Sequence, residues 1–315
     1  MDIKYLSASE VNEKLDMNSC IDIMKDIFMA FADEKIENRL RSVLPIDHGK
    51  LLGIMPAVMP HIETAGAKLI TVFHDNYKIG LPSHQGIVAV FSTEDGQLQG
   101  ICDGSAITAI RTGAVSALAT DCMANKDATV MCLIGGGVQA DMHLKAIPLV
   151  RDIKTVTIWC PAMEESIRFV EKHKDEYSHI TFIPCENCAD AVKDADIICT
   201  VTPSSTPVLK GDWVKEGAHI NAVGACTASA RELDSECVVK SKLVCDNFVS
   251  CKNEAGDYLF PLKEGLITED HILADLARVV SGKTVVRTSE KDITMFESQG
   301  LACEDVACAN WLVNN

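Results

Sequence analysis

The chain has 315 residues, of which 47% are hydrophobic and 23% charged, and its net charge is −16. This balance is typical of a folded globular protein with room for two domains, and not of a disordered or membrane-spanning chain. Lys and Arg form no basic block, which argues against a nucleic-acid surface or an anionic membrane as the partner. We expect a small-molecule partner instead.

The amino end has no charged-then-apolar leader pattern, and no uncharged apolar run reaches about 18 residues. We therefore expect a cytoplasmic protein whose 14 cysteines are reduced thiols. Only Cys185 and Cys188 have metal or redox spacing, and they lack a second pair or a nearby histidine cluster. We interpret them as part of a strand-to-helix connection, and we predict no metal site.

The first part of the chain, to about residue 117, predicts a mixed α+β unit. A helix is expected from Asn18 to Glu34. Three β-like runs follow at Lys50–Ile54, Ala67–Phe73 and Ile87–Ser92, and Glu94–Gln97 predicts a hairpin turn.

Cations stand in apolar surroundings within this part. The helix-like run Ser105–Thr120 carries Arg111 as its only charge, on the face that it shares with Ile107 and Leu118. A buried guanidinium is expensive to desolvate unless a carboxylate or a phosphate pairs with it. The sequence leaves two interpretations open: an internal salt bridge, or an anionic ligand.

Lys68 has a similar position, because an apolar strand-like run follows it, although a half-buried strand tolerates an outward lysine. Arg41 by itself has the character of a surface arginine. If Arg41, Lys68 and Arg111 converge, they form a clamp for a carboxylate. Among the histidines, His84 is the least ordinary because it lies in a turn-rich segment, and we predict that it contacts the substrate.

From about Lys126 onward, short apolar strands alternate with helical stretches. The predicted strands are Val130–Ile134, Val156–Trp159, Thr181–Ile183, Ile197–Val201, His219–Val223 and Leu243–Cys245. Six such runs with helices between them predict an α/β fold with a doubly wound parallel sheet of the Rossmann type. A ligand would lie across the carboxyl ends of the strands.

The first of these strands leads into a Gly-x-Gly-x-x-Ala turn, which is typical of dinucleotide binding. Gly135 allows a tight turn, Gly137 lets the backbone approach a pyrophosphate, and Ala140 lets the next helix pack closely on the sheet. The amino end of that helix then faces the anion. The predicted cofactor contacts in this part are Gly135, Gly137, Val138, Gln139, Ala140, Cys160, Thr202, Val223 and Gly224.

The choice between NAD and NADP stays open. An acidic residue after the second strand favours NAD and an arginine favours NADP, but Cys160 and Pro161 occupy those positions. The absence of a cation there favours NAD. The chain has no Gly-x-Ser-x-Gly elbow and no His-Glu-x-x-His helix, so covalent hydrolysis is not expected.

Nine segments in order resemble the ornithine cyclodeaminase and mu-crystallin family over nearly the whole chain. They are Gly53–Pro56, Gly66–Phe73, Gly80–Pro82, Ile107–Ala114, Gly135–Ala140, Ala195–Ile198, Asn221–Gly224, Arg231–Asp234 and Gly300–Asp305. The resemblance implies a homodimer with a substrate-binding and dimerisation domain, residues 1–117, to which the last helix, about 300–315, returns. Residues 118–299 would form the Rossmann domain.

The resemblance also implies roles for single residues. Arg41, Lys68 and Arg111 would hold the substrate carboxylate, with Lys68 and Arg111 in the catalytic centre. Thr112 and the turn from Gly135 to Gln139 would contact the dinucleotide phosphates.

Two departures from the family pattern bear on the reaction. True cyclodeaminases have a glutamate where this chain has Gly53, and an acid/base aspartate where this chain has Ala225. Both groups that would manage a side-chain amine are missing. We therefore predict an NAD(P)-dependent imine reductase or amino-acid dehydrogenase acting on a small 2-amino or 2-imino acid. The alternatives are an ornithine cyclodeaminase with NAD as a recycled cofactor, a crystallin-like ligand-binding protein, and an opine-type condensing synthase.

Overall fold

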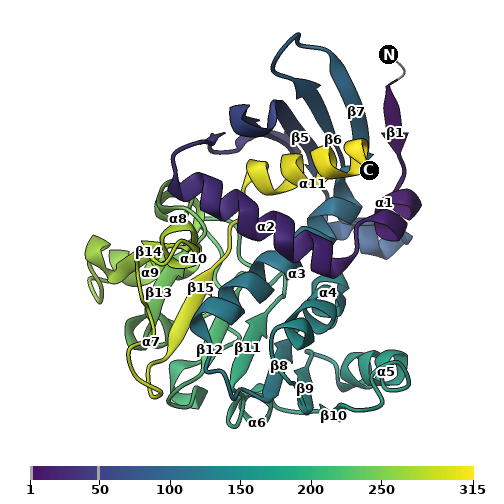
Figure 1. Ribbon diagram of the computed structural model, residues 1–315. Helices are drawn as coiled ribbons and strands as arrows, with labels where there is room; N and C mark the ends of the chain where they lie inside the picture. Colours follow the sequence, from purple (N-terminus) through teal and green to yellow (C-terminus); the bar gives the residue numbers. More distant parts are fainter. Residues whose placement is uncertain (1–2, 48–49) are drawn as a thin grey trace. The chain divides into compact units, whose positions relative to one another are not determined.

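A computed structural model describes residues 3–47 and 50–315 of the protein (Figure 1). Contacts within the chain divide it into two compact units. Unit 1 comprises residues 1–114 and 300–315, and unit 2 comprises residues 115–299. The division falls inside helix α3, Gly104–Met123, and the boundary that the sequence predicted after residue 117 lies in the same helix.

Unit 1 is a mostly antiparallel sheet with helix α11 packed on it. Its strands are β1 Lys4–Leu6, β2 Glu37–Asn38, β3 Ser42–Asp47, β4 Lys50–Met59, β5 Thr64–Val72, β6 His84–Ser92 and β7 Leu98–Asp103. Its helices are α1 Ala8–Lys14, α2 Met17–Ala32 and α11 Ala302–Asn314, with 3-10 turns at Pro60–Ile62 and His74–Ile79. The strand order is β1-β7-β6-β5-β4-β2, and β3 also pairs with β4. Helix α11, yellow in Figure 1, contacts β4, β5, β6 and β7, so the end of the chain covers one face of this sheet.

The sequence predicted the longer elements of unit 1. The expected helix is α2, the three β-like runs lie in β4, β5 and β6, and the hairpin turn joins β6 to β7. Strands β1, β2 and β3 were not predicted, because the first two have only three and two residues and every side chain of β3 is exposed. His84 is the first residue of β6 and not part of a turn, which corrects its expected setting.

Unit 2 is a parallel sheet of eight strands with helices between them. The strands are β8 Val130–Ile134, β9 Thr155–Trp159, β10 Thr181–Pro184, β11 Ile197–Thr200, β12 His219–Ala222, β13 Lys242–Cys245, β14 Ile272–Asp275 and β15 Thr294–Glu297. The helices are α4 Val138–Ala146, α5 Met163–His173, α6 Cys188–Val192, α7 Ser235–Lys240, α8 Phe248–Glu254, α9 Gly256–Lys263 and α10 Leu276–Val280, with 3-10 turns at Ile147–Leu149, Gly211–Trp213 and Glu269–His271. The order β10-β9-β8-β11-β12-β15-β13-β14 confirms the predicted doubly wound fold.

The prediction of six strands was incomplete. Strand β15 lies between β12 and β13, and β14 lies at the edge beyond β13. Both have four residues, the same length as β10 to β13, so length alone does not explain why the pattern missed them. Cys185 and Cys188 lie between β10 and the start of α6, so the strand-to-helix interpretation of that segment is confirmed.

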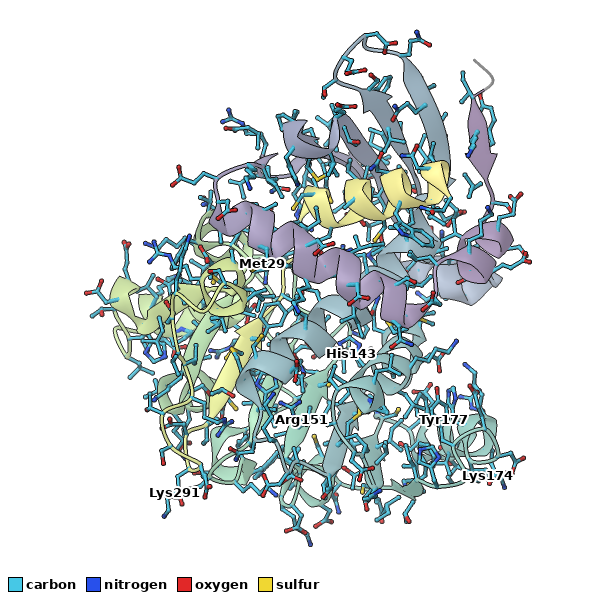
Figure 2. The ribbon with its side chains drawn as sticks, viewed as in Figure 1. Met29, His143, Arg151, Lys174, Tyr177 and Lys291 are labelled. Atoms are coloured by element: carbon cyan, nitrogen blue, oxygen red, sulfur yellow. The ribbon has the colours of Figure 1, made fainter. Side chains whose placement is uncertain are left out.

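An arginine caps the carboxyl end of α3 within unit 2. Arg151, labelled in Figure 2, is 5% exposed, and its Nη2 donates to the carbonyls of Thr120, Asp121 and Ala124, each at 3.0 Å. Its Nε donates to Asn125 O at 2.9 Å. The last turn of a helix leaves carbonyls without partners, and one guanidinium here satisfies several of them.

Across residues 3–47 and 50–315, no helix is both long and apolar enough to cross a membrane. All 14 cysteines lie within these ranges, and none of them forms a disulfide.

We predict that Arg151→Ala lowers the stability of unit 2 by about 3 kcal/mol, because the buried carbonyls at the end of α3 lose charged donors. For a unit of this size the midpoint of thermal unfolding should fall by roughly 6–12 °C, as followed by circular dichroism. Lys154→Ala is the control, because it removes an exposed cation whose ion pair with Asp152 contributes little. A midpoint equal to that of the control would contradict the capping role.

Candidate functional site

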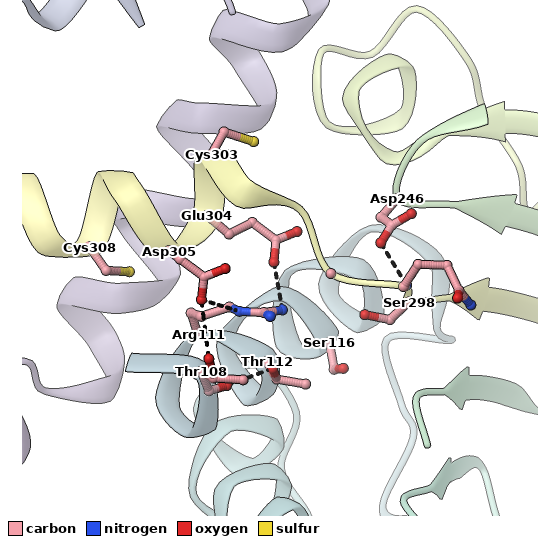
Figure 3. A network of polar contacts seen from close by, with 12 residues as sticks. Thr108, Arg111, Thr112, Ser116, Asp246, Ser298, Cys303, Glu304, Asp305 and Cys308 are labelled. Carbon is pink, nitrogen blue, oxygen red and sulfur yellow. Dashed lines mark hydrogen bonds and ion pairs between the residues drawn. The ribbon is translucent and has the colours of Figure 1, made fainter. Parts of the chain in front are cut away.

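A buried ion-pair network joins strand β5, the unit 1 part of helix α3 and helix α11. Lys68 Nζ lies 2.7 Å from Asp305 Oδ2. Arg111 Nη1 lies 2.8 Å from Glu304 Oε2, and its Nε lies 3.2 Å from Asp305 Oδ1. Figure 3 shows the guanidinium between the two carboxylates. The four side chains are at most 5% exposed, and we call them the ion-pair cluster.

Burial and the neighbouring charges shift the pKa values of Lys68 and Asp305 in the ion-pair cluster. Burial lowers the pKa of Lys68 to about 8; Asp305 opposes this shift, and the positive charges of Arg111 and Arg41 add to it. Burial alone would raise the pKa of Asp305, but Arg111 and Lys68 outweigh it and hold that pKa below its usual value. A lysine with a pKa near 8 can change its charge within the physiological range.

The three cations singled out from the sequence come together. Arg41 Nη2 donates to Gly300 O at 3.1 Å, and its charge acts on Lys68. Of the two interpretations left open for Arg111, the internal salt bridge is present. Lys68 is 2% exposed, so it is not an outward lysine of a half-buried strand. Lys68 and Arg111 are thus held and oriented by carboxylates of their own chain, and Arg41 is bonded to a backbone carbonyl.

Sequence reasoning missed Glu304 and Asp305, although a signal was available. They are the only charged residues of α11, whose remaining side chains are mostly apolar and buried. The argument that exposed the unusual setting of Arg111 applies equally to two carboxylates in an apolar helix. Two buried cations and two buried anions in one chain predict that they pair.

Gly300 is the first residue of the second segment of unit 1. Its backbone conformation leaves room for the guanidinium of the ion-pair cluster. Its φ is +78°, and a Cβ at this position would lie 2.7 Å from Arg111 Nη1. A side chain here would therefore be strained and would displace the guanidinium.

Two further predicted residues of unit 1 lie outside the cluster. Thr112 is buried, and its Oγ1 donates to Thr108 O at 2.7 Å. His84 is exposed, with Nδ1 2.9 Å from Ser83 Oγ, and it pairs with Val72 of β5. Lys68 lies four residues along β5 from that pair, roughly 13 Å away. The substrate role of His84 stays a prediction.

The glycine turn of unit 2 has the geometry that its sequence predicted. Gly135 has a φ of +108° and follows the last residue of β8, and Gly137 is the N-cap of α4. A Cβ on Gly136 would lie 2.8 Å from Cys160 Sγ, whereas a Cβ on Gly137 would have no heavy atom within 4 Å. Open space therefore lies over the amino end of α4, where no side chain caps the first N–H groups.

Four more residues that were predicted to contact the dinucleotide lie at or near the glycine turn of unit 2. Gln139 Oε1, in the first turn of α4, is buried without a hydrogen-bond partner in the described structure. Cys160 is 2% exposed and follows β9. This is the position at which a Rossmann fold contacts the adenosine ribose. Val138 is exposed beside the turn, and Ala140 is fully buried under it.

The remaining predicted contacts follow the next two strands. Thr202 comes shortly after β11, and Val223 and Gly224 come directly after β12, so all three lie at the carboxyl edge of the sheet. Strand β8 neighbours both β9 and β11, and the chain winds outward in both directions from this point. That is where open α/β sheets bind their ligands.

Within the described ranges, no group of three or more His, Cys, Asp or Glu side chains is placed to hold a metal ion. The doubly wound fold and the glycine turn together define a protein of the dinucleotide-binding class.

Comparison with known proteins refines this class. The model of the ornithine cyclodeaminase/mu-crystallin family matches residues 1–315. The chain belongs to this family, which confirms the resemblance seen in its segments.

Individual relatives are similar over nearly their whole length. The Delta(1)-pyrroline-2-carboxylate reductase of Bacillus thuringiensis subsp. konkukian is 34% identical over 309 residues, which are 98% of this chain and 94% of the relative. A solved reductase of the same name from Thermococcus litoralis, in complex with NADH and L-proline, has a TM-score of 0.96 and 34% identity, covering 99% of this chain and 97% of the other. An archaeal alanine dehydrogenase dimer with bound NAD has a TM-score of 0.94 and 30% identity, covering 100% and 96%.

Proposed function

We propose that the protein is an NAD(P)-dependent oxidoreductase that reduces the C=N bond of a small 2-imino acid to a 2-amino acid. The observation that carries this proposal is the convergence of Arg41, Lys68 and Arg111 in a chain that also has a dinucleotide turn. The similar reductase from Thermococcus litoralis, solved with NADH and L-proline, supports both the reaction class and the cofactor class.

The cations bind the substrate carboxylate. Lys68 Nζ has three N–H groups, and two of them donate to Asp305 and to Thr108 Oγ1, at 2.7 and 3.3 Å. A third donor is therefore available to a carboxylate oxygen. Glu304 and Asp305 hold the two buried cations in place, so little conformational entropy is lost when the substrate binds.

In this proposal the two units have different roles. Unit 1 fixes the imino acid, and the nucleotide, when bound to unit 2, supplies the hydride. The turn at Gly135–Gln139 of unit 2 holds its phosphates. The position after β9 favours NAD over NADP, because residues 160–165 contain Glu164 and Glu165 and no cation for a 2′-phosphate.

The two positions that distinguish this chain from cyclodeaminases support a reductase. Gly53 lies in β4, and a Cβ there would already lie 3.2 Å from Ile70 Cγ2. Ala225 is 4% exposed and has no ionisable group. Neither position can bind or deprotonate a side-chain amine, so ornithine cyclisation lacks its acid/base groups.

We further propose a homodimer that buries the face of the unit 1 sheet opposite α11. Ile54, Leu69 and Ile87 lie in register on three adjacent strands of this face, and Leu69 and Ile87 are each 39% exposed. Val58 and Phe91 extend it, each 38% exposed. A second copy is the occupant that we expect, because this apolar face avoids the repulsion between two chains of net charge −16. The similar archaeal alanine dehydrogenase is described as a dimer.

The reaction is tested by following nicotinamide absorbance. We expect consumption of NADH with Delta(1)-pyrroline-2-carboxylate, or with pyruvate plus ammonia. Arg111→Lys should lower kcat/KM by about 10- to 100-fold, because a point charge replaces the bidentate fork, while the Kd for NADH stays nearly unchanged. An unaltered kcat/KM would exclude Arg111 from the clamp.

Other outcomes of the same assay separate the alternatives. Ammonia release from ornithine without net change in nicotinamide absorbance would establish a cyclodeaminase. Binding of NADH without turnover on any imino acid would favour a ligand-binding protein, and turnover only with two amino-acid-derived substrates would favour a condensing synthase.

The KM for the imino acid should depend on pH through Lys68. Its pKa is about 8, so the ammonium is present below that pH and is lost above it. Because only the charged form attracts a carboxylate, we expect KM to rise as pH increases through about 8. Lys68→Arg stays charged and should not show this rise, whatever its absolute activity. Titration of the substrate affects both enzymes equally, so identical alkaline limbs would exclude Lys68.

Leu69→Glu should dissociate the homodimer, because it places two charges in the centre of an apolar interface. Size-exclusion chromatography with light scattering gives the mass directly. Val249→Glu, on helix α8 of unit 2, changes the net charge equally at a 55% exposed position and should leave the mass unaltered. A Leu69→Glu protein with the mass of the wild type would rule out this face as the interface.

A further inference from the structure

Glu232 is a fully buried carboxylate that joins the ends of two neighbouring strands of unit 2. Its Oε1 accepts from Thr202 N and from Thr202 Oγ1, both at 2.6 Å. Its Oε2 accepts from Gly224 N at 2.7 Å. Thr202 follows β11 and Gly224 follows β12, so one side chain holds both segments at the carboxyl edge of the sheet.

The fit around this carboxylate is tight. A Cβ on Gly224 would lie 2.1 Å from Thr202 O and 2.7 Å from the Glu232 carboxyl. Only glycine therefore lets the two segments approach each other and the glutamate together. A buried carboxylate with three donors is well satisfied, whereas Thr202 N has no other partner among the described backbone bonds and would be left unpaired without it.

Glu232 is itself held from two sides. Its carbonyl accepts from Val208 N and Leu209 N, at 2.7 and 3.0 Å. The next residue, Leu233, donates its N–H to Asp257 Oδ1 at 2.7 Å, at the start of α9. Hydrogen bonds therefore fix the backbone that carries the carboxylate.

The order of the strands assigns a place to the two segments that Glu232 holds. The glycine turn follows β8, and Cys160, at the ribose position, follows β9. Strands β11 and β12 lie on the other side of β8 from β9. A dinucleotide whose adenosine end lies over β9 must extend its nicotinamide end over β11 and β12.

We propose that Glu232 is a positioning residue that holds Thr202 and Gly224 in the arrangement that the nicotinamide end of the cofactor requires. This inference rests on the proposed function. It gives Glu232 no contact with the substrate or the reacting atoms; its effect passes through the two segments that it bonds.

Glu232→Gln tests the proposal, because an amide has one acceptor oxygen and one donor nitrogen. Either the Thr202 or the Gly224 N–H would then face another donor. We expect the Kd for NADH to rise about tenfold, which is about 1.4 kcal/mol, with a fall in kcat. ADP-ribose lacks the nicotinamide, and its Kd should not change. A merely structural role would weaken both ligands together.

The controls keep the outcomes distinct. Glu236→Gln removes a carboxylate four residues away that pairs with Lys240 on the exposed side of α7, and should bind both ligands as the wild type does. Thr202→Val removes the hydroxyl that donates to Glu232 and accepts from Ser204 N, but it keeps the Thr202 N–H bond to Glu232. It should therefore show a smaller selective loss of NADH affinity even if Glu232→Gln does not fold.

Equal losses for NADH and ADP-ribose, or no loss in either variant, would overturn the positioning role. A wild-type protein that binds neither ligand would overturn the proposed function and, with it, this inference.

Discussion

Burial of two cations in unit 1 is the constraint on which the site depends. Lys68 and Arg111 lie in a sheet and a helix that exclude water, and an unpaired charge there would cost several kcal/mol. Their partners Glu304 and Asp305 come from the last helix of the chain. The ion-pair cluster therefore ties the end of the chain to its first part and holds the two cations in fixed orientations.

In unit 2 burial also shifts the pKa values of ionisable groups, among them two carboxyl groups. Burial raises the pKa of Glu232, and burial together with neighbouring Glu232 raises the pKa of Asp257 to about 8. Glu232 accepts from backbone N–H groups at the carboxyl edge of the sheet, and Asp257 accepts from the N–H of Leu233. In unit 1 carboxylates orient the cations of the proposed substrate clamp; in unit 2 carboxyl groups fix the backbone beside the proposed cofactor site.

Parallel strands explain why a few short segments carry so much of the expected function. All carboxyl ends of the unit 2 sheet meet at one edge, so the segments after β8, β9, β11 and β12 become neighbours although they are far apart in sequence. Glycine occupies this edge where a Cβ would collide with backbone or with a carboxyl group, as at Gly135 and Gly224. The family relation and the similar reductases agree with the chemistry that this edge supports.

The sequence by itself determined the doubly wound sheet, the turn at Gly135–Ala140 and the unusual position of Arg111, because periodicity, glycine spacing and a lone charge in an apolar helix are local signals. It did not reveal the short strand β15 or the partners of the cations. Whether Arg111 pairs within the chain depends on Glu304, 193 residues away, and the role of Glu232 depends on where β11 and β12 end. Only the tertiary structure decides such contacts, since the energy of a buried charge depends on which groups surround it in space and not on its neighbours along the chain.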